Sequence, residues 1–213
     1  MVVSHSHQFI FVKTAKTAGT SVETYLSSLC DDGDVFTPIF PKMDGHVARN
    51  YLVGQDPDDP FFIQSGELRN HISARNLRWF VRPKVWNSYF KFCVERNPWD
   101  KTLSHYHMVR HRNPSMTFEK YLAEGTLCHN FFRYTDRNDN LIVDQVLRYE
   151  SLNAELADVF EQLGVPFSGE LTVRAKSEYR TDRRHYREVL TDAQRDLIAE
   201  RFQNEIEMFG YEF

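Results

Sequence analysis

The sequence has few cysteines and no long apolar run. Its 213 residues include only three cysteines, Cys30, Cys93 and Cys128, and this odd, widely spaced set predicts neither a disulfide framework nor a zinc knuckle. Cys93 lies in an apolar run, which favours a buried thiol. No apolar stretch reaches the roughly 20 residues that a membrane-spanning helix needs. We therefore expect no structural disulfide and no membrane span.

Net charge is also small. A formal charge of −4 gives no reason to expect nucleic-acid binding by the protein as a whole. The N-terminal residues M-V-V-S-H-S-H-Q contain no basic segment followed by an apolar core, so we expect no signal peptide. A cytoplasmic protein is the default expectation, and the sequence does not predict an oligomeric state.

Length and composition predict a single domain over residues 1–213. The hydrophobic share of 41% and the aromatic share of 14% are typical of a packed globule, and no internal repeat divides the chain. Strand-like and helix-like segments alternate, which predicts an α/β fold with a mostly parallel central sheet flanked by helices. Ligands of such sheets bind beyond the carboxyl ends of the strands.

Apolar spacing places the individual elements. Short apolar runs predict strands at residues 9–12, 35–37, 89–94 and within 141–149. Helical spacing predicts helices at residues 22–29, 71–80, from 98 onward, 118–123, 156–163 and 192–209. Asn97 is expected to cap the helix that starts at Pro98, and Thr191 to begin a capping box with Gln194. Residues 107–115 are expected to be a polar loop or a helix end, and residues 133–140 a loop.

Small polar residues separate the first predicted strand from the helix that follows it. They are Lys16, Thr17, Ala18, Gly19, Thr20 and Ser21. A tight turn that leads into a helix directs unpaired backbone N–H groups at one point, where the helix dipole adds positive charge. A lysine and three hydroxyls add donors, so the stretch predicts a phosphate-type anion site. The alternative interpretation is a plain strand-turn-helix in which the glycine only supplies backbone freedom.

The usual nucleotide-binding loop is G-x-x-x-x-G-K-[ST], with the lysine after the second glycine. Here Lys16 precedes Gly19, so the pattern differs. The order K-T-A-G-T-S after an N-terminal strand instead resembles the 5′-phosphosulfate loop of sulfotransferases that use 3′-phosphoadenosine-5′-phosphosulfate (PAPS).

Further segments carry the same resemblance. F-K-F-C-V-E-R-N-P-W-D-K-T-L-S-H-Y, which contains Arg96 and Ser104, resembles the 3′-phosphate segment of PAPS-dependent sulfotransferases, in the branch with carbohydrate-acting and bacterial members. H-I-S-A-R-N-L-R at residues 71–78, V-D-Q-V-L-R-Y-E-S-L at 143–152 and F-G-Y-E-F at the end are similar to the family as well. The resemblance runs over nearly the whole chain.

The resemblance implies a P-loop-like three-layer sandwich and a PAPS-dependent transferase that needs no metal. Lys16, Thr17, Ala18, Gly19, Thr20 and Ser21 would hold the 5′-phosphosulfate, and Arg96 and Ser104 the 3′-phosphate. Arg184 would reach the cofactor from the C-terminal loop. Ala15 stands where the family usually has proline, which leaves Lys13 open as the inward-pointing lysine, although the glycine spacing favours Lys16. Glu95 stands where an apolar residue is common, and it could pair with Arg96.

Sulfuryl transfer to a hydroxyl needs a base, and a histidine suits this near neutral pH. His71 is the first candidate, His46 the second and Glu67 the third. Lys16 is the candidate for stabilising the charge on the leaving oxygen. Arg75, Arg78 and Arg183 are candidates for contacts to cofactor or acceptor.

Two other functions stay open at this point. One is a nucleotide-dependent kinase with an altered phosphate loop, and the other is a relative that binds the nucleotide without catalysis. The sequence does not predict the acceptor, which could be a saccharide or a small metabolite.

Overall fold

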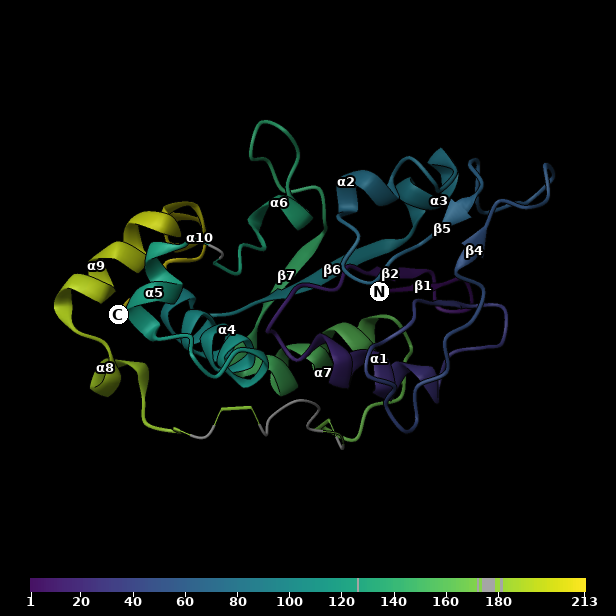
Figure 1. Ribbon diagram of the computed structural model, residues 1–213. Coiled ribbons are helices and arrows are strands. Elements are labelled where there is room, and N and C mark those ends of the chain that lie inside the picture. The colour runs from purple at the N-terminus through teal and green to yellow at the C-terminus, as the bar shows by residue number, and fades with distance from the viewer. Residues whose placement is uncertain (126, 172, 174–178, 181) are drawn as a thin grey trace. The chain divides into compact units, whose positions relative to one another are not determined.

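The structure is a computed structural model that describes residues 1–125, 127–171, 173, 179–180 and 182–213 (Figure 1). The chain divides into two compact units, each described by itself. The sheet unit comprises Met1–Glu95 and Phe132–Ala175, and the helical unit comprises Arg96–Phe131 and Lys176–Phe213. The single domain expected over residues 1–213 stays a prediction.

A five-stranded mixed sheet forms the centre of the sheet unit. Its strands, in spatial order, are β3 (Val35–Phe36), β1 (Val2–Ser4), β2 (Phe9–Phe11), β6 (Phe90–Glu95) and β7 (Gln145–Arg148). The pairs β2–β6 and β6–β7 are parallel, whereas β1 is antiparallel to both of its neighbours. The α/β class is therefore confirmed, with a parallel three-strand centre. A separate two-stranded sheet joins β4 (Leu52–Val53) to β5 (Gly66–Glu67).

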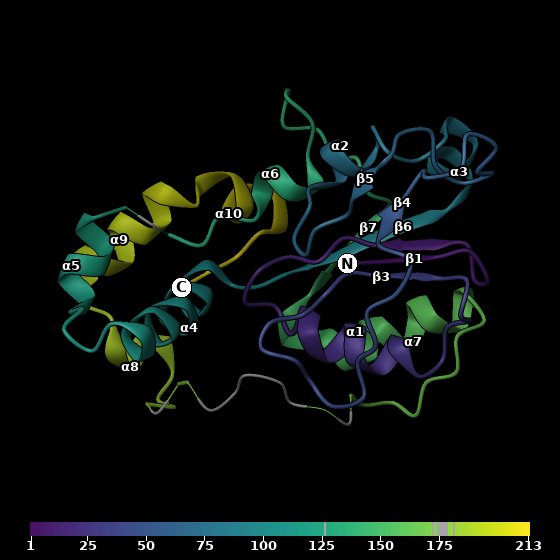
Figure 2. The same ribbon diagram turned by 45° about the vertical axis from the view of Figure 1, so that its right-hand side comes forward.

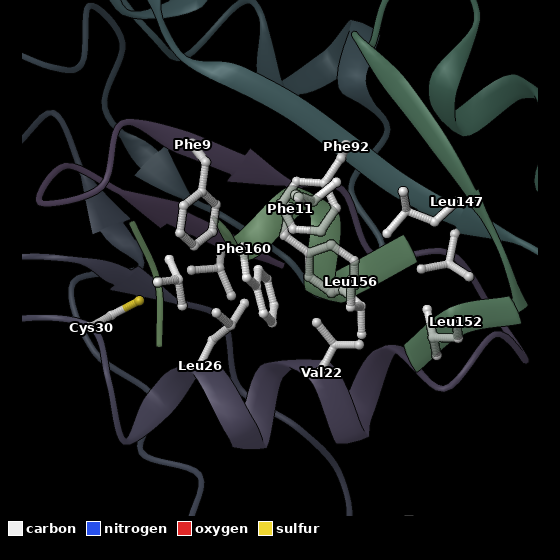
Figure 3. Packing of buried hydrophobic residues seen from close by; sticks show 14 of the residues in the cluster. Phe9, Phe11, Val22, Leu26, Cys30, Phe92, Leu147, Leu152, Leu156 and Phe160 are labelled. Atoms are coloured by element: carbon white, nitrogen blue, oxygen red, sulfur yellow. The ribbon is translucent and has the colours of Figure 1, made fainter. Parts of the chain in front are cut away.

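Two helices cover one face of this sheet, α1 (Gly19–Ser27) and α7 (Leu152–Gln162) (Figures 1 and 2). Phe11 and Phe92 lie directly opposite each other on neighbouring strands, and their rings are 5.2 Å apart. Figure 3 shows these rings packed against Val22 from α1 and Phe160 from α7, all of them fully buried. Burying each such side chain stabilises the fold by roughly 1.5–3 kcal/mol, so this contact fixes both helices on the sheet.

The other side of the sheet carries α2 (Ala74–Leu77) and α3 (Pro83–Ser88) (Figure 2). The helix expected over residues 71–80 is wrong in extent, because α2 contains only four residues and starts after its cap, Ser73. His71 lies outside it, with a φ angle of 65°. The short helices α6 (Phe131–Tyr134) and η1 (Tyr149–Ser151) come later in the chain, and the last two residues of α6 fall where a loop was expected.

The helical unit is built from α4 (Pro98–Arg112), α5 (Phe118–Ala123), α8 (Tyr186–Val189), α9 (Asp192–Arg201) and α10 (Gln203–Phe209). The Asn97 side chain accepts hydrogen bonds from the N–H groups of Trp99 and Asp100, so the predicted cap of α4 is confirmed. The capping box at Thr191 is present too. The prediction of one continuous last helix is wrong. The helix is interrupted at Phe202, which lies between α9 and α10 in the sequence and is fully buried.

Candidate functional site

Residues 13–18 link β2 to α1 with an unusual backbone. Lys16 has a φ angle of 64° and Ala18 one of 60°, the left-handed region that side chains other than glycine rarely adopt. Alternation into this region turns successive N–H groups toward one point and makes an anion-binding concavity. Strain of this kind tends to accumulate where ligands bind. The loop geometry is therefore that of a candidate anion site.

The N-terminus of α1 adds to this site. Ala18 is its N-cap, and no side chain of the described residues caps it. The backbone oxygen of Ala18 accepts from the N–H groups of Ser21 and Val22, so the helix starts tightly. The N–H groups of Gly19 and Thr20, which precede these bonds, have no carbonyl partner within the helix and carry the positive end of the dipole.

The hydroxyls predicted for the loop differ in their roles. Thr14 donates its hydroxyl proton to the backbone oxygen of Val94, and the Thr17 hydroxyl lies 2.7 Å from that of Thr14. Thr14 therefore fastens the loop to β6, and the Thr17 hydroxyl is already engaged with Thr14. The Thr20 hydroxyl has no hydrogen-bond partner among the residues that the structure describes, and Ser21 lies beside it at the start of α1.

The two lysines of the segment occupy different environments. Lys13 is 2% exposed and forms a buried ion pair with Glu23 of α1. Its stem passes so close to Gly19 that a Cβ atom there would lie 2.7 Å from Lys13 Cγ. Lys13 therefore joins β2 to α1, whereas Lys16 is partly exposed in the strained part of the loop. This division favours Lys16 as the lysine that contacts a ligand.

His71 lies against this loop. Its Nδ1 atom is 3.1 Å from the backbone oxygen of Lys13, and because a carbonyl only accepts, Nδ1 carries the proton and Nε2 keeps its lone pair. Burial lowers the pKa of His71 to about 3, together with the charges of Lys13 and Arg133, while the bond to Lys13 acts in the opposite direction. The imidazole is neutral at pH 7, the state that a base needs.

Arg133 completes this arrangement, and the sequence analysis missed it. Its guanidinium donates to the backbone oxygen of His71 from α6. The segment was expected to be a loop, and nothing in its residue pattern connects it to a histidine 62 positions earlier. The contact holds His71 in its left-handed conformation and adds a positive charge beside its ring.

A cavity of about 550 Å³ opens next to His71. It is lined by Glu67, Arg69, Asn70, His71, Ile72, Asn76, Trp79 and Phe80. The Trp79 side chain is 67% exposed, so its indole face is available to a ligand. The size suits a small acceptor molecule, and the third candidate base, Glu67, lies in the same cavity.

The second candidate base, His46, lies elsewhere in the sheet unit. Its Nε2 atom is buried and has no hydrogen-bond partner within the described part of the chain. Burial lowers the pKa of His46 to about 4, with further lowering by the charge of Lys13. His71 differs from it in that its ring donates to the backbone of the candidate anion loop, at Lys13.

The predicted 3′-phosphate residues lie in the helical unit. Arg96 bonds Asp100 through Nε and Nη2, at 2.8 and 2.6 Å. Glu95 is buried and accepts from the Tyr134 hydroxyl at 2.9 Å, and its pairing with Arg96 stays a prediction. Ser104 follows Asp100 one turn later on α4 and has no hydrogen-bond partner among the described residues.

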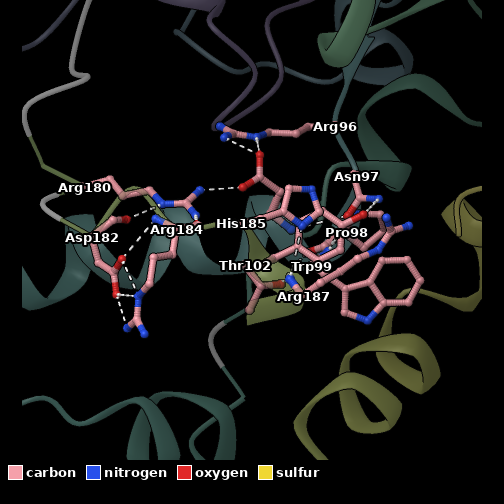
Figure 4. A network of polar contacts seen from close by, with 12 residues as sticks. Arg96, Asn97, Pro98, Trp99, Thr102, Arg180, Asp182, Arg184, His185 and Arg187 are labelled. Atoms are coloured by element: carbon pink, nitrogen blue, oxygen red, sulfur yellow. Dashed lines mark hydrogen bonds and ion pairs between the residues drawn. The ribbon is translucent and has the colours of Figure 1, made fainter. Parts of the chain in front are cut away.

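The remaining candidate arginines are mostly exposed. The Arg184 side chain is 62% exposed and pairs with Asp182 at 2.6 Å (Figure 4). Arg78 caps the end of α2, with its guanidinium 5.8 Å from the Trp86 ring. Arg75 lies within α2 and Arg183 is exposed.

The described ranges contain neither a cluster of metal ligands nor a membrane-spanning helix. No three His, Cys, Asp or Glu side chains in these ranges gather as metal ligands would. No helix in the same ranges has the length and apolar character to cross a bilayer. The three cysteines are buried free thiols.

The fold and the loop define an α/β protein with a candidate anion site after its second strand. A protein from Archaeoglobus fulgidus, described only as an uncharacterized protein, is 35% identical to this chain over 106 residues. The match covers 87% of that protein and 45% of this chain, so the chain belongs to the same family as the archaeal protein. No family model matches the chain, and no solved structure matches it.

Proposed function

We propose that this protein is a sulfotransferase that moves a sulfuryl group from PAPS to an acceptor hydroxyl. One observation carries the proposal: the strained residues Lys16 and Ala18 lead into a helix that no side chain of the described residues caps, and a neutral histidine whose Nε2 keeps its lone pair lies against the same loop. An anion site beside a base is what transfer from a phosphosulfate donor to a hydroxyl requires.

The loop would bind the 5′-phosphosulfate. Backbone N–H groups of residues 16–20 and the Thr20 and Ser21 hydroxyls would donate to its oxygens. Lys16 would stabilise the charge that develops on the oxygen bridging phosphorus and sulfur. The sequence resemblance assigns the 3′-phosphate to Arg96 and Ser104, and Arg184 to the cofactor as well.

The reaction is an in-line displacement. The acceptor oxygen forms a bond to sulfur while the bond from sulfur to the bridging oxygen breaks, and 3′-phosphoadenosine 5′-phosphate leaves with the negative charge. The acceptor proton passes to Nε2 of His71. A pKa near 3 makes the free histidine a weak base, but a bound anionic donor offsets the charge of Lys13 and raises that pKa toward neutrality.

The cavity that contains Trp79 would hold the acceptor, a saccharide or small metabolite. An exposed indole offers an apolar face for a ring, and Asn70 and Asn76 offer amide groups to hydroxyls. The finer fold class, a P-loop-like three-layer sandwich, and a cytoplasmic location belong to this proposal as well.

Calorimetric titration tests the donor site. The protein should bind 3′-phosphoadenosine 5′-phosphate at least tenfold more tightly than ATP, which carries a 5′-triphosphate and has no 3′-phosphate. Tighter binding of ATP would point to a kinase and overturn the proposal. Transfer of radiolabelled sulfate from PAPS across a panel of hydroxyl acceptors then separates an enzyme from a relative that only binds the nucleotide.

A further inference from the structure

Two charged side chains of opposite sign line the cavity beside His71. Glu67 ends β5, Arg69 follows two residues later, and both belong to the cavity wall (Figure 2). Both residues are exposed. Neither side chain forms an ion pair or a hydrogen bond with any residue that the structure describes. A carboxylate and a guanidinium are therefore available to one ligand in the same cavity.

The backbone places these two side chains on one side of the chain. Leu68, which lies between them, is fully buried, and its N–H donates to the backbone oxygen of Tyr51 at 2.8 Å. The segment thus continues in extended form beside the strand β4. Alternate residues of an extended segment point to the same side, with Cα atoms about 6–7 Å apart. The long side chains of Glu67 and Arg69 can therefore reach one small ligand together.

Apolar surface adjoins the two charges. The Trp79 side chain, which lines the cavity just after α2, is 67% exposed. Leu52 of β4 is directly opposite Glu67 in the two-stranded sheet and is 60% exposed. Residues that are paired in this way share a face of the sheet. An indole ring and an apolar side chain thus offer contacts to the carbon skeleton of a ligand.

Asn70 adds an acceptor to the same wall. Its Oδ1 atom is buried and has no hydrogen-bond partner among the described residues, a state that costs free energy. Turning the amide toward a donor in the cavity would break no hydrogen bond of this oxygen. An ammonium group has three N–H donors and a positive charge, so it matches the Glu67 carboxylate and the Asn70 oxygen together.

We propose that the acceptor is a zwitterion, a small hydroxyl compound with both an amino group and a carboxylate, such as a hydroxylated amino acid. This rests on the proposed sulfotransferase function and names the class of its acceptor. Glu67 and Asn70 bind the ammonium, and the fork of Arg69 binds the carboxylate. Such a compound has no net charge, so it avoids the repulsion that an anionic acceptor would meet beside an anionic donor. Glu67 is then a binding residue and not a base.

The test uses three compounds that differ in one charged group. The zwitterion is trans-4-hydroxy-L-proline. The second compound, 3-hydroxypyrrolidine, lacks its carboxylate, and the third, 3-hydroxycyclopentanecarboxylate, has a CH₂ group in place of its amine. NMR titration follows the indole N–H signal of Trp79, which is identified among the three tryptophans by its loss in Trp79→Phe. Wild-type protein should bind the zwitterion about tenfold or more tightly than either other compound, because each lacks one charged contact.

Two substitutions should separate the charged contacts. Glu67→Gln should weaken binding of hydroxyproline and 3-hydroxypyrrolidine about 5- to 20-fold and change that of the carboxylate less than about twofold. Arg69→Gln should weaken hydroxyproline and the carboxylate by a similar factor and spare 3-hydroxypyrrolidine. Glu161→Gln and Arg137→Gln are the matched controls, since both residues are exposed in the sheet unit and neither lines the cavity. They should leave all three affinities unchanged.

The outcomes distinguish the acceptor class from the function itself. If hydroxyproline binds no more tightly than the two singly charged compounds, or if none of the three binds, the zwitterion proposal is wrong. Unchanged hydroxyproline affinity in Glu67→Gln or in Arg69→Gln would also overturn it. Calorimetry with 3′-phosphoadenosine 5′-phosphate tests the donor site independently. Failure to bind this nucleotide by a protein that still selects the zwitterion would overturn the sulfotransferase function alone.

Discussion

The Nδ1 atom of His71 lies 3.1 Å from the backbone oxygen of Lys13, although 58 residues separate the two along the chain. This contact joins the candidate base to the candidate anion loop within the sheet unit. It also determines the tautomer, because only a protonated Nδ1 can donate to the carbonyl.

Replacing Lys16 with alanine should abolish most sulfuryl transfer. The loop keeps its backbone donors, but the charge on the leaving oxygen loses its ammonium, and losing one such group costs about 100- to 1,000-fold in kcat. Initial rates with radiolabelled PAPS measure the effect. Lys84→Ala, at an exposed lysine of α3, is the control and should keep wild-type rates. Normal turnover by the Lys16→Ala variant would show that Lys16 does not stabilise the leaving oxygen.

The low pKa of His71 predicts how stability depends on pH. The folded protein keeps His71 neutral down to about pH 3, whereas the unfolded chain protonates it near its ordinary value of about 6.5. Between these values the unfolded state binds the extra proton, so the free energy of unfolding falls as pH falls. His71→Asn should therefore lose less stability than wild type between pH 7 and pH 4.5, as measured by urea unfolding.

His185 provides the control for this comparison. It is exposed and caps α8 by accepting from the N–H of Arg187, and asparagine is a good cap in its place. His185→Asn should keep the wild-type dependence on pH. The same dependence in His71→Asn as in wild type would show that His71 is not held neutral by the fold.

Replacing Arg133 with glutamine should raise the pKa of His71. The guanidinium donates to the His71 backbone oxygen and adds a nearby positive charge, which disfavours the imidazolium. NMR titration of the His71 ring measures the shift directly, without an acceptor. Arg133→Lys should leave the pKa of His71 lower than Arg133→Gln does, because lysine retains the positive charge. Catalysis should fall by about tenfold in the glutamine variant, since a misplaced base transfers the proton less well. An unchanged pKa of His71 in the glutamine variant would show that Arg133 does not influence the candidate base.

Replacing Gly19 with alanine should destabilise the protein by about 1–3 kcal/mol. The added methyl would lie 2.7 Å from Cγ of Lys13, so the Lys13 stem must move away from Glu23 and strain a buried ion pair. Gly33→Ala is the control, because nothing lies within 4 Å of a Cβ atom there, and it should change stability by less than about 1 kcal/mol. Equal urea midpoints for the two variants would contradict this packing account.

Local features of the sequence were enough to predict several elements. Asn97 followed by Pro98 predicted the start of α4, because an amide side chain caps free N–H groups and proline needs none. The small residues from Lys16 to Ser21 predicted the turn before α1. These signals act over a few residues, so they do not depend on the tertiary packing around them. The strand at Val2–Ser4 gave no such signal, because the polar residues S-H-S-H-Q follow Val3 and leave no apolar run as long as that at residues 9–12.

The chain alone determined where the strands of the parallel centre lie and where a phosphate-type loop is expected, because apolar periodicity and turn chemistry are local properties. Only the tertiary structure decided that Lys13 is a buried partner of Glu23, and that His71 lies outside α2 and is held by the guanidinium of Arg133. Each of these contacts joins side chains that are distant in sequence and come together only through packing. Residue type alone does not predict such contacts.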